Sequence, residues 1–236
     1  MKKIWTLIVC TLMAATLSFA QDEQGSRANQ GAKLSIGARG AFDYGIMYGF
    51  KEEDDDVDGK PTGIGFEGGA MFRIQMIPNL YFAPEVNIAY VSVSHKYNKM
   101  ERTYTSTDLE IPLLIRGTVA DKFYVTAGPQ AVINISNDAD IEVPEVKLGD
   151  LKFDVDYEEK LEQAKFTFGL TAGFGYNIFA GLFVDARFYM GLMELYPDVA
   201  YILDLDSTDD ADSYSMINMA GAKMMKIKVG LSYWFI

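Results

Sequence analysis

His95 is the only histidine of the chain, and an imidazole can act as a general base near neutral pH. Ser92 and Ser94 precede it and carry hydroxyl groups that such a base could activate. The two serines alternate with His95, however, so in an extended chain they point to the opposite face. No serine lies in a Gly-x-Ser-x-Gly motif. We therefore predict that the chain is not an enzyme, and we keep as an alternative an enzyme acting on lipid or peptide through loop carboxylates and His95.

A possible cation site lies further towards the N-terminus. Asp54, Asp56 and Asp58 are spaced two apart and are followed by Gly59, as in the first half of a calcium-binding loop. The twelfth position of that loop is Gly65, where a bidentate glutamate would be needed. A solvated acidic loop is the simpler interpretation of this segment. We accordingly predict no metal and no cofactor, with these three aspartates as a weak candidate.

Charged residues also recur on the polar side of segments in which polar and apolar residues alternate. Buried charges are tolerated only when they are paired and hydrogen-bonded, so a mixed set of this kind on an inward face predicts an internal ion-pair network. The set comprises six cations and five anions: Arg39, Asp43, Glu67, Arg73, Glu85, Glu110, Arg116, Asp185, Arg187, Lys226 and Lys228.

Eight segments show this alternation, which places successive side chains on opposite faces of a β-strand. They are residues 34–48, 64–77, 80–96, 108–120, 123–135, 165–179, 182–193 and 224–236. Tight turns at 78–79, 121–122 and 180–181 alternate with long connections near 50–62, 97–107, 136–164 and 197–222. Within the third connection, residues 146–155 could form a hairpin. The prolines inside strands, Pro84, Pro112 and Pro129, each lose a ladder hydrogen bond, and we expect bulges to accommodate them.

The number and spacing of these segments predict an all-β fold: an eight-stranded antiparallel up-and-down transmembrane β-barrel with short periplasmic turns and long outer loops. Glycines on the polar face and aromatic residues near both ends of the apolar face favour lipid outside and charge inside. A soluble periplasmic lipocalin-like binding barrel, which would bury the apolar face, is the alternative. The last strand carries Lys228, Gly230, Tyr233 and Phe235, a pattern that resembles the C-terminal assembly signal of bacterial outer-membrane proteins.

The N-terminus reads as a cleavable signal peptide over residues 1–20, because Lys2 and Lys3 precede a short apolar run that ends in small residues. We predict a short periplasmic segment over residues 21–32 and the outer-membrane barrel domain over 33–236. The single cysteine, Cys10, lies in the signal peptide, so disulfides are not expected. The full chain has a net charge of −12, which argues against nucleic-acid binding.

Three segments carry a family resemblance: Leu80-Tyr81-Phe82-Ala83-Pro84-Glu85-Val86, Leu109-Glu110-Ile111-Pro112-Leu113-Leu114-Ile115-Arg116 and Ala127-Gly128-Pro129. They resemble the PorT-like outer-membrane β-barrel family. The resemblance implies an eight-stranded barrel in the outer membrane, and the namesake of the family takes part in protein secretion across that membrane. No catalytic residues carry over from it.

These observations lead to one leading hypothesis: a small, closed, non-enzymatic barrel of the bacterial outer membrane with acidic surface loops. It would serve envelope integrity or partner contact, and a protein-secretion accessory role is the form that the resemblance implies. The expected partners are outer-membrane lipid and lipopolysaccharide, the outer-membrane barrel assembly machinery, and a possible secretion or surface partner protein.

Overall fold

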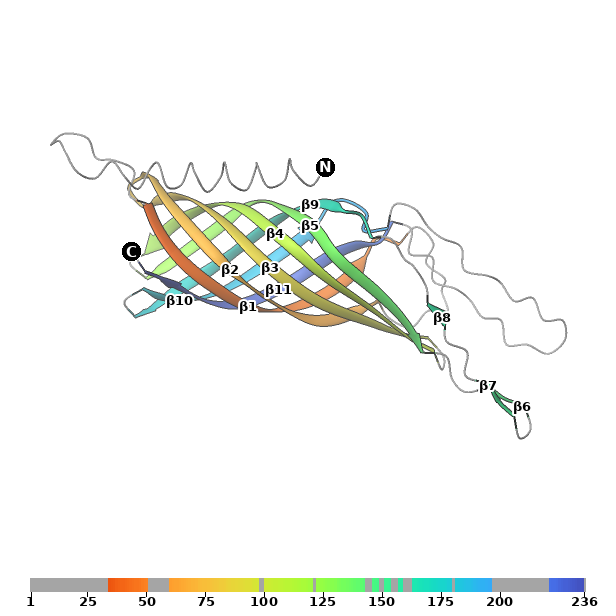
Figure 1. The fold of residues 1–236 in the computed structure, drawn as a ribbon. Coiled ribbons are helices and arrows are strands. Elements are labelled where there is room, and N and C mark those ends of the chain that lie inside the picture. The colour runs from red at the N-terminus through yellow and green to blue at the C-terminus, as the bar shows by residue number, and fades with distance from the viewer. Residues whose placement is uncertain are drawn as a thin grey trace. The chain divides into compact units, whose positions relative to one another are not determined.

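The structure, a computed structural model, describes residues 34–50, 60–97, 100–120, 122–142, 146–148, 151–153, 157–158, 163–179, 181–196 and 221–235. Eight long strands dominate these residues (Figure 1). They are β1 (Leu34–Tyr48), β2 (Thr62–Ile77), β3 (Leu80–Tyr97), β4 (Met100–Ala120), β5 (Phe123–Glu142), β9 (Phe166–Phe179), β10 (Leu182–Gly191) and β11 (Lys223–Trp234).

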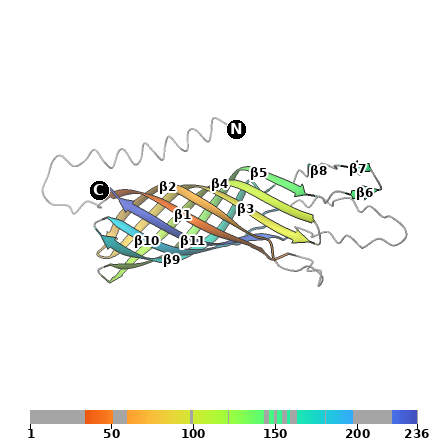
Figure 2. The same ribbon diagram turned by 90° about the horizontal axis from the view of Figure 1, so that it is seen from below.

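All neighbouring strands are antiparallel, and the sheet closes on itself. The strand order is β4-β3-β2-β1-β11-β10-β9-β5, and a further pairing of β4 with β5 completes the ring. The first and last strands pair along almost their whole length, from Gly37 opposite Trp234 to Tyr48 opposite Lys223. Figure 2 shows the inclined strands of this barrel from a second direction. Closure gives every strand two neighbours, which a sheet needs in lipid because no water can satisfy an open edge. The predicted fold is confirmed.

The two faces of the barrel differ in the way the alternation predicts. Along β2, Phe66 on the outside is 63% exposed, whereas its neighbour Glu67, on the inside, is 5% exposed. The same contrast separates Leu113, which is exposed, from the buried Leu114 in β4. The lipocalin-like alternative is therefore wrong, because the apolar face lies outside and the polar face lies within.

Three of the connections join their strands at one end of the barrel, which we call the turn end. Its turns lie at Pro78 and Asn79, at Lys122 and at Gly181, and residue 235 of the chain lies there as well. Asn79 and Gly181 have φ angles of 65° and 82°, a left-handed conformation that asparagine and glycine tolerate. The opposite end, where β1 finishes and β11 starts, is called the loop end. Within the described residues, no helix is long and apolar enough to cross a membrane.

The predicted connection over residues 97–107 is wrong. β3 and β4 continue as a hairpin until Tyr97 pairs with Met100, and β5 stays paired with β4 as far as Glu142 (Figure 1). Ser and Thr occupy the outward positions 92, 94, 103, 105 and 107 in this part of β3 and β4, so it lacks the apolar alternation on which the sequence-based boundary depended. The predicted hairpin at 146–155 is confirmed by pairing of β6 (Val146–Leu148) with β7 (Leu151–Phe153). A two-residue strand, β8 (Tyr157–Glu158), pairs with the end of β5.

The prolines inside strands are not accommodated by bulges. In β3–β4 the register passes from Pro84 opposite Leu113 to Asn87 opposite Glu110, so both strands advance by the same number of residues. The register of β5 against β9 is continuous through Pro129 opposite Leu170. The ladder therefore opens locally around Pro112 and keeps its register. Shifts occur elsewhere, at Gln75/Ile77, Thr107/Asp108, Thr118/Ala120 and Leu182/Phe183.

Candidate functional site

The interior of the barrel holds a network of buried ion pairs. Arg187 in β10 donates to both oxygens of Glu85 in β3, at 2.8 and 2.9 Å, in a bidentate pair that crosses the lumen. Its Nε lies 3.0 Å from Asp185. Arg39 in β1 donates to Asp185 at 2.7 Å and to Glu67 in β2. The first three strands are thereby connected to the distant β10 by charge-assisted hydrogen bonds, which are among the strongest that side chains form.

Lys228 lies at the centre of the network, nearer the loop end. Its ammonium group donates to Glu67 at 2.6 Å and to Glu110, and lies 4.0 Å from Asp43. The three carboxylates have oxygens within 4.8 Å of one another, close enough to surround a cation. The ammonium group of Lys228 contacts all three of them. Lys226 donates to Glu110 at 2.7 Å from the adjacent inward position of β11.

Uncharged groups extend the network towards the loop end. Gln130 donates to Glu110 at 2.8 Å and accepts a 2.6 Å hydrogen bond from Thr171. Asp108 accepts hydrogen bonds from Asn134 and Ser106, at 2.8 and 3.1 Å. Sequence reasoning did not include Asp108 in the network. The signal was available, because Asp108 lies two residues before Glu110 and therefore on the same face of β4.

Two members of the predicted network do not join it. Arg73 and Arg116 lie near the turn end and make no ion pair with a carboxylate in the described part of the chain. The Arg116 guanidinium instead stacks on the ring of Tyr124, 3.4 Å from its centroid, and lies 4.7 Å from that of Phe183. Arg73 lies 4.7 Å from the ring centroid of Trp234 and donates to Ser35 at 3.2 Å. Alternation fixes the face on which a side chain lies but not its height in the barrel, so it could not separate these arginines from the paired ones.

Above the ion pairs, apolar side chains cap the lumen at the loop end. Leu195 and Tyr196 follow β10 and are 5% and 4% exposed. Backbone hydrogen bonds from Leu195 N to Ala222 O and from Ala164 N to Leu195 O, both 2.7 Å, hold this segment in place. We call the following cluster the apolar cap: Met47, Val91, Val93, Tyr104, Leu195, Tyr196, Ala222 and Met224, with Phe50 packed against it. Burial raises the pKa of the Tyr196 phenol, so its hydroxyl stays neutral.

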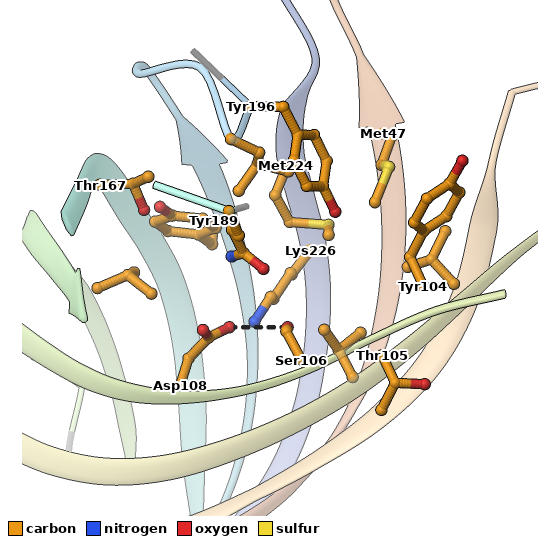
Figure 3. A pocket seen from close by; sticks show the side chains of 15 residues that line it. Met47, Tyr104, Thr105, Ser106, Asp108, Thr167, Tyr189, Tyr196, Met224 and Lys226 are labelled. Carbon is orange, nitrogen blue, oxygen red and sulfur yellow. Dashed lines mark hydrogen bonds between the residues drawn. The ribbon is translucent and has the colours of Figure 1, made fainter. Parts of the chain in front are cut away.

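A small cavity separates the apolar cap from the charged network. Figure 3 shows Tyr196 and Met224 on its loop-end side, with Lys226 extending towards Asp108 and Ser106 on the other. The volume within which the centre of a water molecule can move is about 20 Å³, so the cavity has room for about one water molecule. An eight-stranded barrel is only just wide enough for its interior side chains, and here they fill it.

Glycines on the inner face make this filling possible. A Cβ atom at Gly175 would come within 2.3 Å of the ring of Tyr124, and one at Gly169 within 2.5 Å of the ring of Tyr189. Large inward side chains of neighbouring strands therefore occupy the space that a side chain at either of these two positions of β9 would need. A Cβ atom at Gly173, on the same inward face, would likewise come within 2.7 Å of the side chain of Arg187.

The remaining candidates lie apart from this network. His95 is in β3, paired with Arg102, and its side chain lies outside the described part of the chain. Ser92 and Ser94 are on the outward parity of β3, where Ser92 accepts from Thr105 at 3.4 Å and Ser94 lies 3.1 Å from Thr103. Asp54, Asp56 and Asp58 lie outside the described residues.

The C-terminal strand places the four residues of the predicted assembly signal on both faces. Lys228 and Gly230 are buried on the inside, whereas Tyr233 and Phe235 are 44% and 60% exposed on the outside. The two aromatic rings contact each other edge to face at a centroid distance of 5.5 Å. Recognition of this strand by the assembly machinery stays a prediction.

A closed barrel with an apolar exterior and a charged, filled interior defines an integral outer-membrane β-barrel. The chain belongs to the family described as outer membrane protein beta-barrel domain, whose model matches residues 19–196. This membership places the protein in the bacterial outer membrane.

Solved structures and curated sequences were also compared. Neisserial surface protein A is 10% identical, covers 85% of this chain and 98% of its own, and superposes with a TM-score of 0.47. Ail, the attachment invasion locus protein of Yersinia pestis, is 10% identical, covers 86% of this chain and 99% of its own, and gives a TM-score of 0.41. No curated protein sequence matches this chain.

Proposed function

We propose that this protein is a closed, non-enzymatic outer-membrane barrel that contacts a partner protein through a sheet projecting from its loop end. The projecting sheet consists of residues 91–97 of β3, 100–107 of β4 and 136–142 of β5, beyond the last outward-facing apolar positions of the wall. Its existence is the observation on which the proposal depends. The filled centre and loop end of the lumen support the same proposal, because the ion pairs and the apolar cap leave no continuous pathway for a solute.

The position of the projecting sheet follows from the outward side chains. On β3 the outward positions from Leu80 to Tyr90 are apolar, a span of eleven residues, which matches the 9–11 residues of a tilted transmembrane strand. Beyond Tyr90 the outward residues of β3 and β4 are Ser92, Ser94, Thr103 and Thr105, whose hydroxyls pair across the strands. From Tyr90 to Tyr97 the strand rises by roughly 23 Å along its own direction. Polar outward residues over this length favour a position outside the hydrocarbon.

The projecting sheet also offers an edge for a partner. β2 begins at Thr62, which pairs with Ser94, so within the described residues the backbone of β3 from His95 to Tyr97 has no neighbour on that side. An exposed edge can accept a strand from another protein, and backbone hydrogen bonds then supply much of the affinity. A secretion-accessory role is the specific form of partner contact that the PorT-like resemblance implies.

A photo-crosslinking experiment tests the proposal. A photoreactive amino acid is placed at Thr103 or Thr105 in the projecting sheet, and cells are irradiated. We expect a discrete protein adduct from both positions, seen as a band of higher mass on denaturing gels. The matched control is the same amino acid at Leu113, on the same strand and the same face but in the apolar band, where no protein adduct is expected.

The outcome that contradicts the proposal is an absence of protein adducts at Thr103 and Thr105 in cells where the barrel is assembled at normal abundance. Equal adducts at Leu113 would also contradict it, because the contact would then involve the wall of the barrel.

A further inference from the structure

The turn end of the lumen has an excess of positive charge. Of the six inward cations, Arg73 and Arg116 are those without a carboxylate partner in the described part of the chain. Arg116 is 6% exposed and Arg73 is half-buried at the rim. Both guanidinium groups lie within 6 Å of the Trp234 ring centroid, at 5.7 and 4.7 Å. Two unpaired cations are thus held around one aromatic side chain.

Unused hydrogen-bond donors lie at the same end. The hydroxyl of Tyr124 and Nε1 of Trp234 are buried and have no hydrogen-bond partner. The Arg116 guanidinium stacks on the Tyr124 ring and lies 5.7 Å from the Trp234 ring centroid. The hydroxyl of Ser232, two residues before Trp234 on the inward face of β11, is also buried and unpartnered. Buried polar groups normally find partners, so three orphaned donors in one region require an explanation. Oδ1 of Asn177 is an unpartnered acceptor at this end, and rotation of its amide would present a donor in its place.

The excess of positive charge is confined to the turn end, because the interior carboxylates that lack a hydrogen bond from a cation lie nearer the loop end. Towards the loop end, Asp43 has no hydrogen-bond partner for either oxygen, and Asp108 is held by uncharged Asn134 and Ser106. Six cations and six carboxylates therefore occupy the described interior, with the unpaired cations at the turn end. Asp43, 4.0 Å from Lys228, and Asp108 accept no hydrogen bond from a cation, and they lie nearer the loop end. An anion at the turn end would complete the local pairing.

We infer that the turn end of the lumen is a binding site for a small oxyanion, a phosphate or a carboxylate group, held by Arg73 and Arg116. Guanidinium groups present several donors in a planar fork that fits both kinds of oxyanion. Tyr124 and Trp234 supply further donors, and Arg73, which is half-buried, is partly exposed at the turn end. A free ion and an oxyanion carried on a larger molecule present the same group to this site, and the competition experiment below distinguishes them.

Trp234 provides a direct readout of this site. The chain has two tryptophans, Trp5 and Trp234, so the full chain carrying Trp5→Phe reports on Trp234 alone. The barrel is purified in an uncharged detergent and titrated with inorganic phosphate or with acetate at constant ionic strength, with chloride as the replacement ion. We expect a saturable change in Trp234 fluorescence with phosphate or acetate and none with chloride. Competition by an acidic or phosphorylated peptide then distinguishes a carried group from a free ion.

Variants make the test specific. Arg73→Gln and Arg116→Gln should each weaken the apparent affinity at least tenfold, whereas Lys122→Gln, which removes an exposed cation from a turn at the same end, should change it less than twofold. Arg73 lies at the rim, so Arg73→Gln keeps the test valid if Arg116→Gln does not fold. No saturable signal, an equal signal with chloride, or unchanged affinity in a folded arginine variant would each overturn the inference.

Discussion

At the scale of single residues, Lys228 shows how the barrel tolerates charge in its centre. A buried ammonium group loses its hydration, a cost that only well-placed carboxylates can offset. Lys228 hydrogen-bonds to Glu67 and Glu110, and each of these also contacts a second cation, Arg39 or Lys226. Loss of one member therefore leaves unpaired charge in a site from which water is largely excluded.

Lys228→Met should destabilise the barrel by about 3–5 kcal/mol, because it removes one partner of a buried ion pair and leaves the carboxylates behind. Urea unfolding in lipid vesicles measures the free energy. Lys122→Met, in an exposed turn, is the control and should change it by less than about 0.5 kcal/mol. If the two variants unfold alike, the network does not contribute to stability as inferred.

Adding Glu110→Gln to Lys228→Met tests whether Lys228 and Glu110 interact. Glu110→Gln in the Lys228→Met background removes one of the stranded carboxylates, so the double variant should recover part of the lost stability. Additive losses would show that the two side chains do not interact.

At the scale of elements, each strand is divided by depth as well as by face. The outward residues of β4 nearer the turn end are apolar: Leu109, Ile111, Leu113 and Ile115. Those nearer the loop end are Thr103, Thr105 and Thr107. Its continuation beyond the apolar positions lets β3, β4 and β5 form the projecting sheet. The boundary between lipid and water therefore crosses β4 near Thr107 and Leu109.

Leu113→Arg should destabilise the folded barrel by about 2–4 kcal/mol, the cost of an arginine on the lipid face near the membrane midplane. Thr105→Arg places the same side chain on the same strand and face above the apolar band, and should cost at most about 1 kcal/mol. Unfolding in vesicles and the heat-dependent gel mobility of the folded barrel measure both. Equal costs at the two positions would remove the basis for placing the projecting sheet outside the membrane.

At the scale of the whole molecule, the barrel is asymmetric along its axis. The turn end has short connections and an excess of unpaired cations, while the loop end has the apolar cap and the projecting sheet. Barrels of this class place short turns in the periplasm and long connections outside, so the loop end is expected to face the medium.

Cysteine labelling of intact cells tests this orientation. The only natural cysteine, Cys10, lies in the predicted signal peptide and is replaced by serine to leave a clean background. Thr105→Cys should react with a membrane-impermeant maleimide in intact cells, whereas Lys122→Cys should react only after the outer membrane is permeabilised. The reverse pattern would mean that the projecting sheet lies in the periplasm.

The sequence by itself determined the strands of the wall, their faces and the closure of the barrel. Alternation of apolar and polar residues has the period of the β-strand, so it identifies the inward side of residues as separate as Arg39 and Lys226 without any knowledge of contacts. Alternation did not identify the strands where the outward residues cease to be apolar. On the loop-end side of Tyr90 in β3 and Leu109 in β4, the outward face carries hydroxyl side chains, and this composition is typical of loops.

Only the tertiary structure decided which inward residues meet. Lys228 and Glu110 are 118 positions apart in the chain, and their contact depends on the tilt and register of all the strands between them. The same geometry leaves Arg116 on aromatic rings instead of beside a carboxylate, and folds Leu195 and Tyr196 over the loop end. Alternation gives one coordinate of each side chain, its face, whereas pairing inside a barrel also depends on height and on position around the axis.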